Sequence, residues 1–265
     1  MGVEQLARNE FKYAVRPDQL EDLRRCLRAF CVPDGFYLPE KNGWYTVDTL
    51  YLESPDLRVY RSCEDQHLVR SKLRIRTYPD APNAVAKVEV KRRIHELILK
   101  TGVVVPGEGW EAWILGTRPA VSLPDRDRAS LQEFLTMQRT QNLGPYLLIR
   151  YQRQAWRSVY EDYVRLTFDR QMECQPMDRY SLNGDPRRWT AVDDEGSLAT
   201  PGALLLELKF KQRPPIWMAD MVRRFGLQRQ GFSKYCSGIR RIRQERHYLL
   251  DRVPVSAKGA FAWIC

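Results

Sequence analysis

The chain has 265 residues, with 43 lysines and arginines against 33 aspartates and glutamates, which gives a formal net charge of +10 at pH 7. This length provides a full core in at most two domains, and the charge favours an anionic partner: nucleic acid, a membrane surface or a phosphate compound. The sequence contains no run of 18 apolar residues and no signal-peptide pattern, so we expect a cytoplasmic protein without a transmembrane helix.

Histidine and cysteine usage argues against two further classes of site. The three histidines are too few for a histidine-based metal centre or catalytic triad, and there is no Cys-x-x-Cys pair. The cysteine spacing matches neither a zinc site nor a disulfide framework, so we expect reduced thiols in the cytoplasm. The cysteines are Cys26, Cys31, Cys63, Cys174, Cys236 and Cys265.

The first half of the chain predicts strands with helices between them. A strand over 8–13 is followed by a helix that opens at Pro17 and ends near 33–35. The segment 57–68 is either a strand pair or a short helix followed by a strand. Further strands are predicted over 45–52, 69–78, 85–92 and 95–105.

The second half continues the same pattern. It predicts a short helix within 106–124, a helix over 127–137, a polar loop or excursion over 176–202, and helices that open at Pro214 and at Ser233, the last one running to about 247. Strands are predicted over 146–155, 158–161, 163–169 and 204–211. Without regular βαβ alternation, this order predicts one α+β domain over 1–265 with a mainly antiparallel sheet.

The basic strand over 70–78 has an unusual face. Residues two apart on a strand point the same way, so Lys72, Arg74 and Arg76 share one face while Leu73 and Ile75 share the other. Three like charges in a row repel each other unless the face meets water, acids or a polyanion. This strand by itself therefore fits a solvated face as well as a face that meets acids or a polyanion.

Mixed charge on one strand face recurs along the chain. It is seen at 8–13, 85–91, 165–169 and 206–211, and each of these strands combines bases with an acid such as Glu89, Asp169 or Glu207. One such strand is an ordinary solvated sheet face. Five of them predict a sheet curled so that its charged faces line a common interior.

The residue types on these faces suit phosphate chemistry. Glycine-rich phosphate loops and the nucleophile elbow are absent from the sequence, so phosphates would have to be held by side chains. Arginine grips two phosphate oxygens at once, and carboxylates bind Mg²⁺ or Mn²⁺ together with a nucleotide's phosphates. Bases plus a few carboxylates are the minimum for phosphoryl transfer by positioning and charge neutralisation.

Two other interpretations compete with this one. The charges on each strand could be cross-strand ion pairs on a solvated sheet face. The seven tryptophans and thirteen tyrosines could stack on nucleic-acid bases, but most lie on apolar faces or in helices, where core packing is expected. We therefore expect no nucleic-acid partner.

The chain resembles the VTC domain, the polyphosphate polymerase branch of the triphosphate tunnel metalloenzymes, which are also called CYTH-like. Single motifs are weak, but their order across nearly the whole chain is fairly specific. The motifs that carry the resemblance lie at 12–13, 72–78, 88–91, 150–156, 165–169, 206–209 and 232–235.

The resemblance implies an antiparallel β-barrel that forms a charged tunnel, with helices packed outside. It also implies an ATP-dependent polymerase that passes the γ-phosphate of ATP to the end of a polyphosphate chain, with Mn²⁺ or Mg²⁺. ATP and polyphosphate would be its ligands. A separate membrane protein is a further implied partner, which would place the domain at the inner face of a membrane.

The resemblance and the strand faces together assign roles to individual residues. The expected catalytic residues are Arg74, Arg76, Lys91 and Lys234. The expected phosphate-binding residues are Lys12, Lys72, Lys100, Arg150, Arg165 and Lys209. The expected metal ligands are Glu207, Glu89 and Asp169.

One departure bears on the reaction. Triphosphatases of this superfamily begin with Glu-x-Glu-x-Lys, whereas residues 8–12 read Arg-Asn-Glu-Phe-Lys, so a base stands in place of the first acid. This favours the polymerase branch over simple triphosphate hydrolysis. A triphosphatase and a non-catalytic module that binds polyphosphate or inositol phosphates remain the alternatives.

Overall fold

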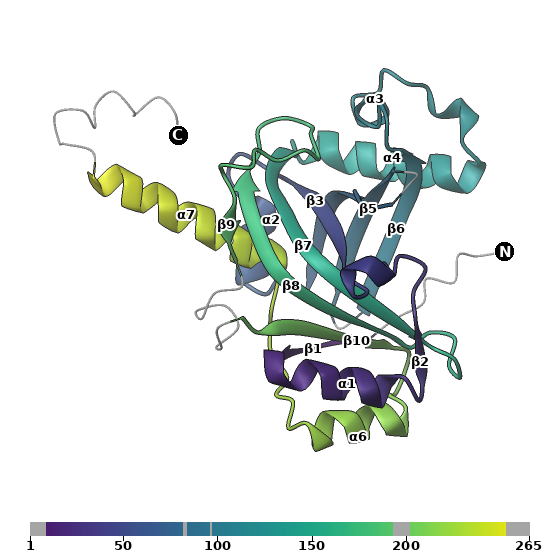
Figure 1. Cartoon of the computed structure of the whole chain (residues 1–265). Coiled ribbons are helices and arrows are strands. Elements are labelled where there is room, and N and C mark those ends of the chain that lie inside the picture. The colour runs from purple at the N-terminus through teal and green to yellow at the C-terminus, as the bar shows by residue number, and fades with distance from the viewer. Residues whose placement is uncertain (1–8, 82–83, 96, 193–201, 253–265) are drawn as a thin grey trace.

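The computed structural model describes residues 9–81, 84–95, 97–192 and 202–252, and within them an antiparallel sheet flanked by helices (Figure 1). Its main path is β1-β10-β8-β7-β3-β4-β5-β6, with β2 added beside β7 and β9 beside β8. The strands are β1 (Asn9–Val15), β2 (Cys31–Pro33), β3 (Tyr45–Glu53), β4 (Val69–Thr77), β5 (Val85–Ile94), β6 (Leu97–Pro106), β7 (Gly144–Ser158), β8 (Arg165–Pro176), β9 (Thr190–Ala191) and β10 (Leu204–Phe210).

The helices lie between strands and at the C-terminal end. The α-helices are α1 (Leu20–Leu27), α2 (Arg58–Glu64), α3 (Glu111–Ile114), α4 (Asp125–Thr140), α6 (Ile216–Arg224) and α7 (Lys234–Arg252). Single 3₁₀ turns are η1 (Pro17–Gln19), η2 (Pro39–Lys41) and η3 (Ala120–Ser122). The expected α+β class with an antiparallel sheet is therefore confirmed.

Two predicted segments differ from the structure, and a third had been left open between two alternatives. The first helix ends at Leu27, and the chain then forms β2, whose three residues carry too little pattern to be recognised. Of the two alternatives for 57–68, the short helix is confirmed, because this segment contains α2 and the next strand, β4, begins at Val69. No strand forms over 158–161, because β7 runs on to Ser158 and the chain then turns into β8.

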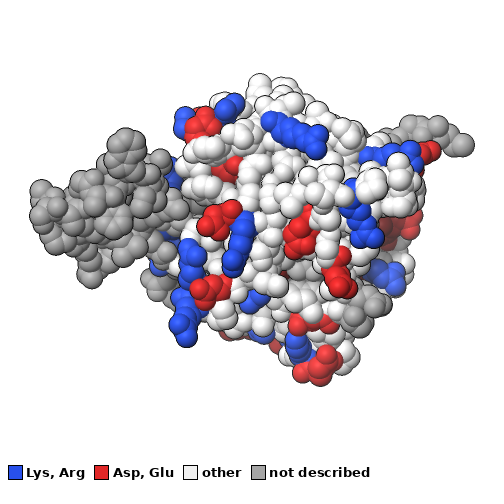
Figure 2. All heavy atoms as spheres, turned by 90° about the horizontal axis from the view of Figure 1, so that it is seen from above, with Lys and Arg blue, Asp and Glu red and all other residues white. Residues whose placement is uncertain are grey.

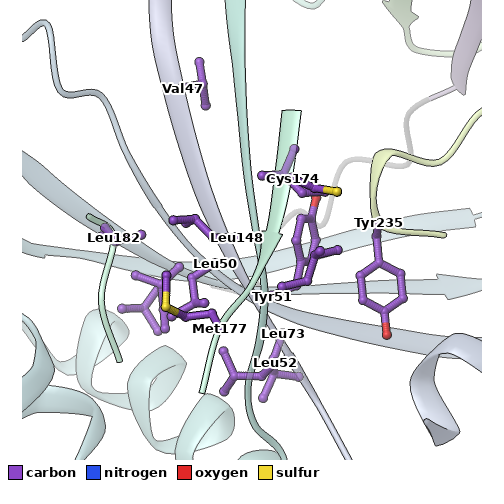
Figure 3. Packing of buried hydrophobic residues seen from close by; sticks show 14 of the residues in the cluster. Val47, Leu50, Tyr51, Leu52, Leu73, Leu148, Cys174, Met177, Leu182 and Tyr235 are labelled. Atoms are coloured by element: carbon purple, nitrogen blue, oxygen red, sulfur yellow. The ribbon is translucent and has the colours of Figure 1, made fainter. Parts of the chain in front are cut away.

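The larger hydrophobic core packs helices against the β3–β7 part of the sheet. Leu50, Leu148 and Leu73 are fully buried there, with Tyr235 of α7 at the edge of the cluster (Figure 3). The buried face of α4 adds Leu131 and Phe134. These helices therefore cover the side of the sheet that carries its apolar residues.

A second core lies under β1, β10 and β8. Leu23 and Leu27 of α1 and Met218 and Met221 of α6 are buried against apolar residues of these strands. Figure 1 shows α1 and α6 side by side along this part of the sheet. Both ends of the strand order are thus backed by helices on the apolar face, which leaves the other face for the charged residues.

Backbone pairing does not close the sheet into the expected barrel. In the described residues the strand path has two ends, β1 and β6, with no hydrogen-bonded pairing between them. The sheet is nevertheless strongly curved. Its curvature brings β1 close enough to β5 for Glu10 to form an ion pair with Lys91 at 3.3 Å. A side-chain ion pair, rather than a ladder of backbone hydrogen bonds, connects β1 at one end of the path to β5, the strand next to the other end.

Candidate functional site

Cross-strand register brings the charged faces of β4 and β5 together. Residues directly opposite each other in an antiparallel pair project from the same face. Lys72 lies opposite Lys91, and Arg74 lies opposite Glu89. On the other side of β4, Arg76 lies opposite Thr49 of β3. The basic strand therefore presents its charges to the inner face of the curve.

The same arrangement holds at the β1 end of the sheet. Lys12 lies opposite Glu207, and Glu10 lies opposite Lys209. Arg153 of β7 lies opposite Asp169 of β8. Lys234, in the first turn of α7, reaches the same group of side chains.

We call these residues the inner charge cluster. Its described members are nine bases and four acids, a formal excess of five positive charges. The bases are Lys12, Lys72, Arg74, Arg76, Lys91, Lys100, Arg153, Lys209 and Lys234, and the acids are Glu10, Glu89, Asp169 and Glu207.

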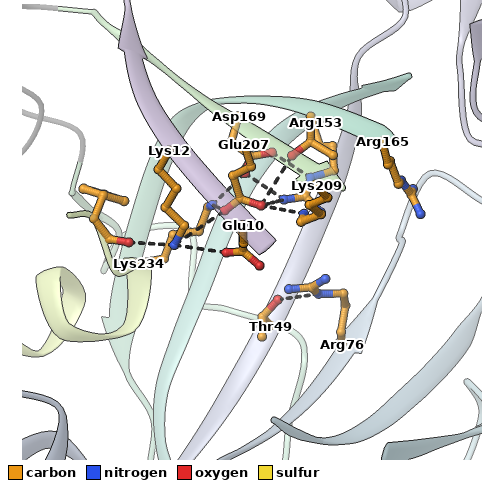
Figure 4. A network of polar contacts seen from close by, with 12 residues as sticks. Glu10, Lys12, Thr49, Arg76, Arg153, Arg165, Asp169, Glu207, Lys209 and Lys234 are labelled. Carbon is orange, nitrogen blue, oxygen red and sulfur yellow. Dashed lines mark hydrogen bonds and ion pairs between the residues drawn. The ribbon is translucent and has the colours of Figure 1, made fainter. Parts of the chain in front are cut away.

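Glu207 is the most heavily contacted acid of the cluster. Its carboxylate is 2.7 Å from Lys209 Nζ, 3.1 Å from Lys234 Nζ, 3.6 Å from Arg153 Nη2 and 3.9 Å from Lys12 Nζ (Figure 4). Burial alone would raise the pKa of Glu207, but these cations outweigh it and hold the pKa well below its usual range. Glu207 is therefore ionised at neutral pH.

Asp169 is fully enclosed beside Glu207. Both of its oxygens accept hydrogen bonds from Arg153, at 2.7 Å each, and Lys234 Nζ lies 2.6 Å away. Burial opposes ionisation of Asp169, but Arg153 and Lys234 still lower its pKa. Asp169 thus fixes the positions of two bases.

Glu89 organises a second group of charges. It accepts a hydrogen bond from Arg74 Nε at 2.7 Å and forms an ion pair with Lys100 of β6. Opposite Glu89 lies Gly102, where an added Cβ would come within 2.7 Å of the Val88 carbonyl oxygen and 3.2 Å of Glu89 Cγ. A glycine at this position leaves the space that the Glu89 side chain occupies.

Burial also changes the lysines of the cluster. It lowers the pKa of Lys91 to about 8 despite the nearby Glu10, and it lowers the pKa of Lys100 to about 8 despite Glu89. In Lys234, Asp169 and Glu207 outweigh burial and raise the pKa. Lys91 and Lys100 are therefore the cluster bases closest to losing their charge at mildly alkaline pH.

Arg76 of the cluster and the neighbouring Tyr151 are buried and retain unused hydrogen-bonding capacity. Arg76 is 8 % exposed and donates from Nε to Thr49 Oγ1 at 3.1 Å, and no carboxylate in the described residues lies within ion-pair distance of it. The Tyr151 hydroxyl is buried and has no hydrogen-bond partner in the same part of the chain. The Tyr151 ring lies near Arg153 and Lys234, whose cations are 5.2 and 4.9 Å from its centre.

Most of the predicted site residues come together in this cluster. Lys72 lies at its edge, where Nζ contacts Ser233 Oγ at 3.1 Å. Arg150 does not join, because it projects from the opposite face and forms a two-point ion pair with Asp48 at 2.8 Å. Arg165, at the start of β8, is half-exposed and paired with Asp34 at 2.6 Å. Figure 4 shows Arg165 apart from the network of contacts around Glu207.

Three members of the interior were not among the predicted site residues. Arg153 is three residues from Arg150 and so projects from the other side of β7, where it pairs with Asp169. Glu10 bridges Lys12 and Lys91, at 3.3 Å from each, and Tyr151 shares the face of Arg153. The odd spacing between Arg150 and Arg153 shows from sequence that the two side chains lie on opposite faces of the strand. It does not show which face points to the interior, because that depends on the neighbouring strands.

A cavity among the described residues lies elsewhere. Its volume is about 200 Å³, and its lining includes Arg24, Gln154 and Trp156, which project from the outer face of β7 and from α1. Arg24 is already bound there by Glu21 and Gln154. The candidate phosphate-binding charges therefore lie in the inner charge cluster and not in this cavity.

On the face seen from above, basic and acidic side chains are interspersed and form no single basic patch (Figure 2).

The acids of the cluster supply carboxylate oxygens, the ligands that Mg²⁺ and Mn²⁺ prefer. No group of three or more His, Cys, Asp or Glu side chains that could hold a metal ion is found within the described ranges. Mg²⁺ and Mn²⁺ bind through one or two carboxylates together with substrate phosphates, and do not need a complete protein cage. Glu207 and Glu10, whose charges interact across the β1–β10 pair, fit that requirement.

No helix in the described part of the chain is long and apolar enough to cross a membrane. Comparison with curated proteins gave no match. Among solved structures, the PH1819 protein from Pyrococcus horikoshii OT3 matches with 12 % identity and a TM-score of 0.45, covering 87 % of this chain and 96 % of that one.

The sequence model of one family, the VTC domain, matches residues 7–243. This match spans the strands and the first turns of α7, and so includes every member of the inner charge cluster. The chain therefore belongs to the VTC domain family, which includes the polyphosphate polymerase.

Proposed function

We propose that this protein is an ATP-dependent polyphosphate polymerase. The γ-phosphoryl group of ATP would be transferred to the terminal oxygen of a polyphosphate chain on the inner face of the sheet, and ADP would leave. Family membership supports a phosphate ligand. The observation that carries the proposal is Arg76, a buried guanidinium with no carboxylate partner in the described residues and a second arginine beside it.

A polyanion would relieve an unfavourable charge distribution. The cluster has five more bases than acids, and several of these bases are buried, where repulsion is weakly screened. In Arg76 both burial and Arg74 oppose the charged state, although other neighbours keep its pKa above the ordinary value. Phosphate oxygens match the arginine fork and would also accept the free hydrogen bond of Tyr151.

We infer that the curved sheet acts as a tunnel in which this chain of phosphates lies. The support is the Glu10–Lys91 ion pair, which connects strands near the two ends of the open path. Bases contributed by β1, β4, β5, β7 and α7 then surround one interior. One VTC-type domain over residues 1–265 remains part of this proposal.

Position within the cluster suggests the roles of its residues. Arg74, Arg76, Lys91 and Lys234 are proposed to contact the phosphoryl group that is transferred, with Arg153 and Tyr151 added to them. Lys12, Lys72, Lys100 and Lys209 are proposed to hold the remaining phosphates. Arg150 and Arg165 are omitted from this set, because their partners Asp48 and Asp34 hold them away from it.

A divalent cation is the implied cofactor, Mn²⁺ or Mg²⁺. Glu207 and Glu10 would hold it together with the phosphates, and it would supply neutralisation of the charge that develops on the phosphate oxygens. Both oxygens of Asp169 accept hydrogen bonds from Arg153, and Glu89 contacts Arg74 and Lys100 on the β4–β6 side of the cluster, so we propose that these two acids position bases. We further propose a cytoplasmic protein with a separate membrane protein as partner.

The test is to incubate the purified protein with ATP and Mn²⁺ and to separate the products on a gel. A ladder of phosphate polymers is the expected result. Release of orthophosphate alone would identify a triphosphatase, and no consumption of ATP would identify a binding module; either outcome would overturn the polymerase proposal.

A further inference from the structure

Helix α7 fills one end of the inner face of the sheet. Tyr51 of β3 lies between a base of the inner charge cluster on β4 and Leu147 on β7, so Leu147 shares the inner face, as does Ile149 two residues further on. Both β7 side chains are fully buried under α7, where a Cβ added to Gly238 would lie 3.0 Å from Leu147 and 3.4 Å from Ile149. Tyr235 of the same helix contacts Tyr51, with ring centres 5.1 Å apart (Figure 3). A phosphate chain therefore meets a packed helix at this end.

Aromatic side chains fill the opposite end of the inner face, which lies beyond Arg76 on β4. Lys87 of β5 lies opposite Arg76, and its ammonium is 4.8 Å from the ring centre of Tyr78 and 5.5 Å from that of Phe36. The Phe36 and Tyr78 rings are stacked, with centres 4.4 Å apart, and Tyr45 is tilted against both. Tyr45 and Tyr78 are buried. A phosphate chain therefore meets packed rings at this end as well.

The inner face becomes more exposed toward β6. The side chains of Arg153 on β7 and Lys234 on α7 are each 9 % exposed, and that of Arg74 on β4 is 13 % exposed. The exposed fraction then rises to 29 % for Lys91 on β5 and to 48 % for Lys100 on β6. Solvent therefore reaches these bases from the side on which β6 lies.

Between β1 and β6 the interior has no wall of paired backbone. These strands are the two ends of the strand path and are not paired in the part of the chain that the structure describes. Val104 of β6 lies opposite Lys87 on the inner face and is 53 % exposed, so no neighbouring strand covers it. The Glu10–Lys91 ion pair bridges this gap, and it can open without breaking a backbone hydrogen bond. We call the gap bordered by Glu10, Lys91, Lys100 and Val104 the side opening.

We propose that polyphosphate enters and leaves the interior through the side opening, so that the site accepts interior stretches of a long chain as well as its ends. This inference rests on the proposed function, since it requires that the inner face holds phosphates. Lys100 and Lys91 are the first bases that an entering chain meets, because their side chains reach solvent. Phosphate oxygens replace Glu10 as the partner of Lys91, and the chain then moves inward to Arg74 and Arg76. A chain bound in this way needs no free end and no passage past α7.

The test compares two forms of one long-chain polyphosphate, the first with free ends and the second with biotin on both ends, each capped by streptavidin. A folded protein at each end cannot pass through an interior lined by side chains, so the capped chain cannot be threaded. Calorimetric titration of the wild-type protein with each form gives the two affinities, with capped biotin alone as the blank. We expect affinities equal within about threefold. A larger loss of affinity for the capped chain would show that a free end must be threaded, and would overturn the side entry.

Arg76→Met shows where the capped chain binds. Because Arg76 lies inside the cluster, this variant should weaken binding of both forms by the same factor. If it weakened binding of the free-ended chain alone, the capped chain would be bound on the outer surface and the side entry would be wrong.

A bulky residue at the side opening supplies a second measurement. Val104→Trp narrows the opening and should slow the association of tripolyphosphate at least about threefold. Val121→Trp is the matched control, because Val121 is a 76 % exposed valine of η3, away from the inner face, and its association rate should not change. An unchanged rate in Val104→Trp would contradict entry at this place. Failure of the free-ended chain to bind the wild-type protein would overturn the proposed function, and the side entry with it.

Discussion

Glu207 is where the positive charges of the cluster are most concentrated. Four cations approach its carboxylate, so its loss would leave buried bases without a counter-charge. A carboxylate that only pairs with lysine could be replaced by glutamine at modest cost to activity. A ligand of a divalent cation could not, because an amide lacks the charge that holds the ion against water.

We predict that Glu207→Gln retains nucleotide binding but loses turnover and the dependence of nucleotide binding on Mn²⁺. The free energy of unfolding should also fall by about 2–4 kcal/mol, because several buried bases lose their partner. Calorimetric titration with and without Mn²⁺ measures the binding. Glu173→Gln, on the outer face of β8 opposite Arg150, is the control. Near-normal turnover in Glu207→Gln would exclude Glu207 as the metal ligand.

Lys91 predicts a dependence on pH. Its pKa of about 8 means that it loses its charge as pH rises from 7 to 9, so tripolyphosphate binding should weaken over this range. Lys91→Arg stays charged and should weaken less. The affinity ratio of the two proteins at each pH separates Lys91 from titration of the ligand itself. A ratio that is constant from pH 7 to 9 would contradict the prediction.

The same lysine acts in the opposite direction on the stability of the free protein. Its pKa is lower in the folded state than its ordinary value of 10.5, so the charged lysine costs stability below pH 8. That cost is relieved between about pH 8 and 10.5, where the unfolded chain binds more protons. Chemical denaturation should show this gain, relative to Lys91→Arg, in the absence of ligand.

At the scale of elements, α7 positions Lys234 through its first turn. Ser233 was predicted as the N-cap, and its Oγ does accept a hydrogen bond from the Cys236 N–H. We predict that Ser233→Ala lowers the free energy of unfolding by about 0.5–2 kcal/mol and reduces turnover, because the cap and the contact with Lys72 are both lost. Ser130→Ala is the control, because this partly buried serine of α4 donates only to the Arg126 carbonyl oxygen of its own helix. Thermal denaturation and ATP consumption report the two effects, and unchanged turnover would show that the cap does not position Lys234.

The strands show which parts of the site could be predicted from sequence and which could not. Charged alternation was enough to place Lys72, Arg74 and Arg76 on one face, because each strand determines this by itself. It did not distinguish Arg150 from Arg153, since only their cross-strand partners do so. On β8, Gln171 adopts a positive φ of 49° where the register shifts, so alternation cannot be carried through it from Asp169 to Glu173.

At the scale of the whole molecule, the family followed from the ordered motifs, and the antiparallel class followed from the lack of regular βαβ alternation. Whether the sheet closes into a barrel could not be predicted, because the pairing of its two end strands depends on sheet curvature and not on the composition of either strand. β1 and β6 are the unpaired ends of the strand path, and the Glu10–Lys91 ion pair links β1 to β5 beside them. This arrangement is a property of the tertiary structure. The short β2 was missed for the same reason, as it is defined by its pairing with β7.

The central claim is that the inner face of this sheet, and not the outer one, holds polyphosphate. Substitution of one arginine on each face of the sheet tests this claim. Arg76 is buried among like charges without a carboxylate partner in the described residues, so Arg76→Met should preserve or slightly raise stability. Arg150 neutralises the buried Asp48 on the outer face, so Arg150→Met should lower the free energy of unfolding by about 1–3 kcal/mol.

The most direct measurement is calorimetric titration of tripolyphosphate into the wild-type protein and these two variants, with the melting temperature of each. We predict that Arg76→Met weakens binding at least about tenfold, the loss of one charge-assisted contact to phosphate, and melts no lower than the wild type. Arg150→Met should bind like the wild type and melt lower. Wild-type affinity in Arg76→Met, or loss of binding in Arg150→Met alone, would contradict the account.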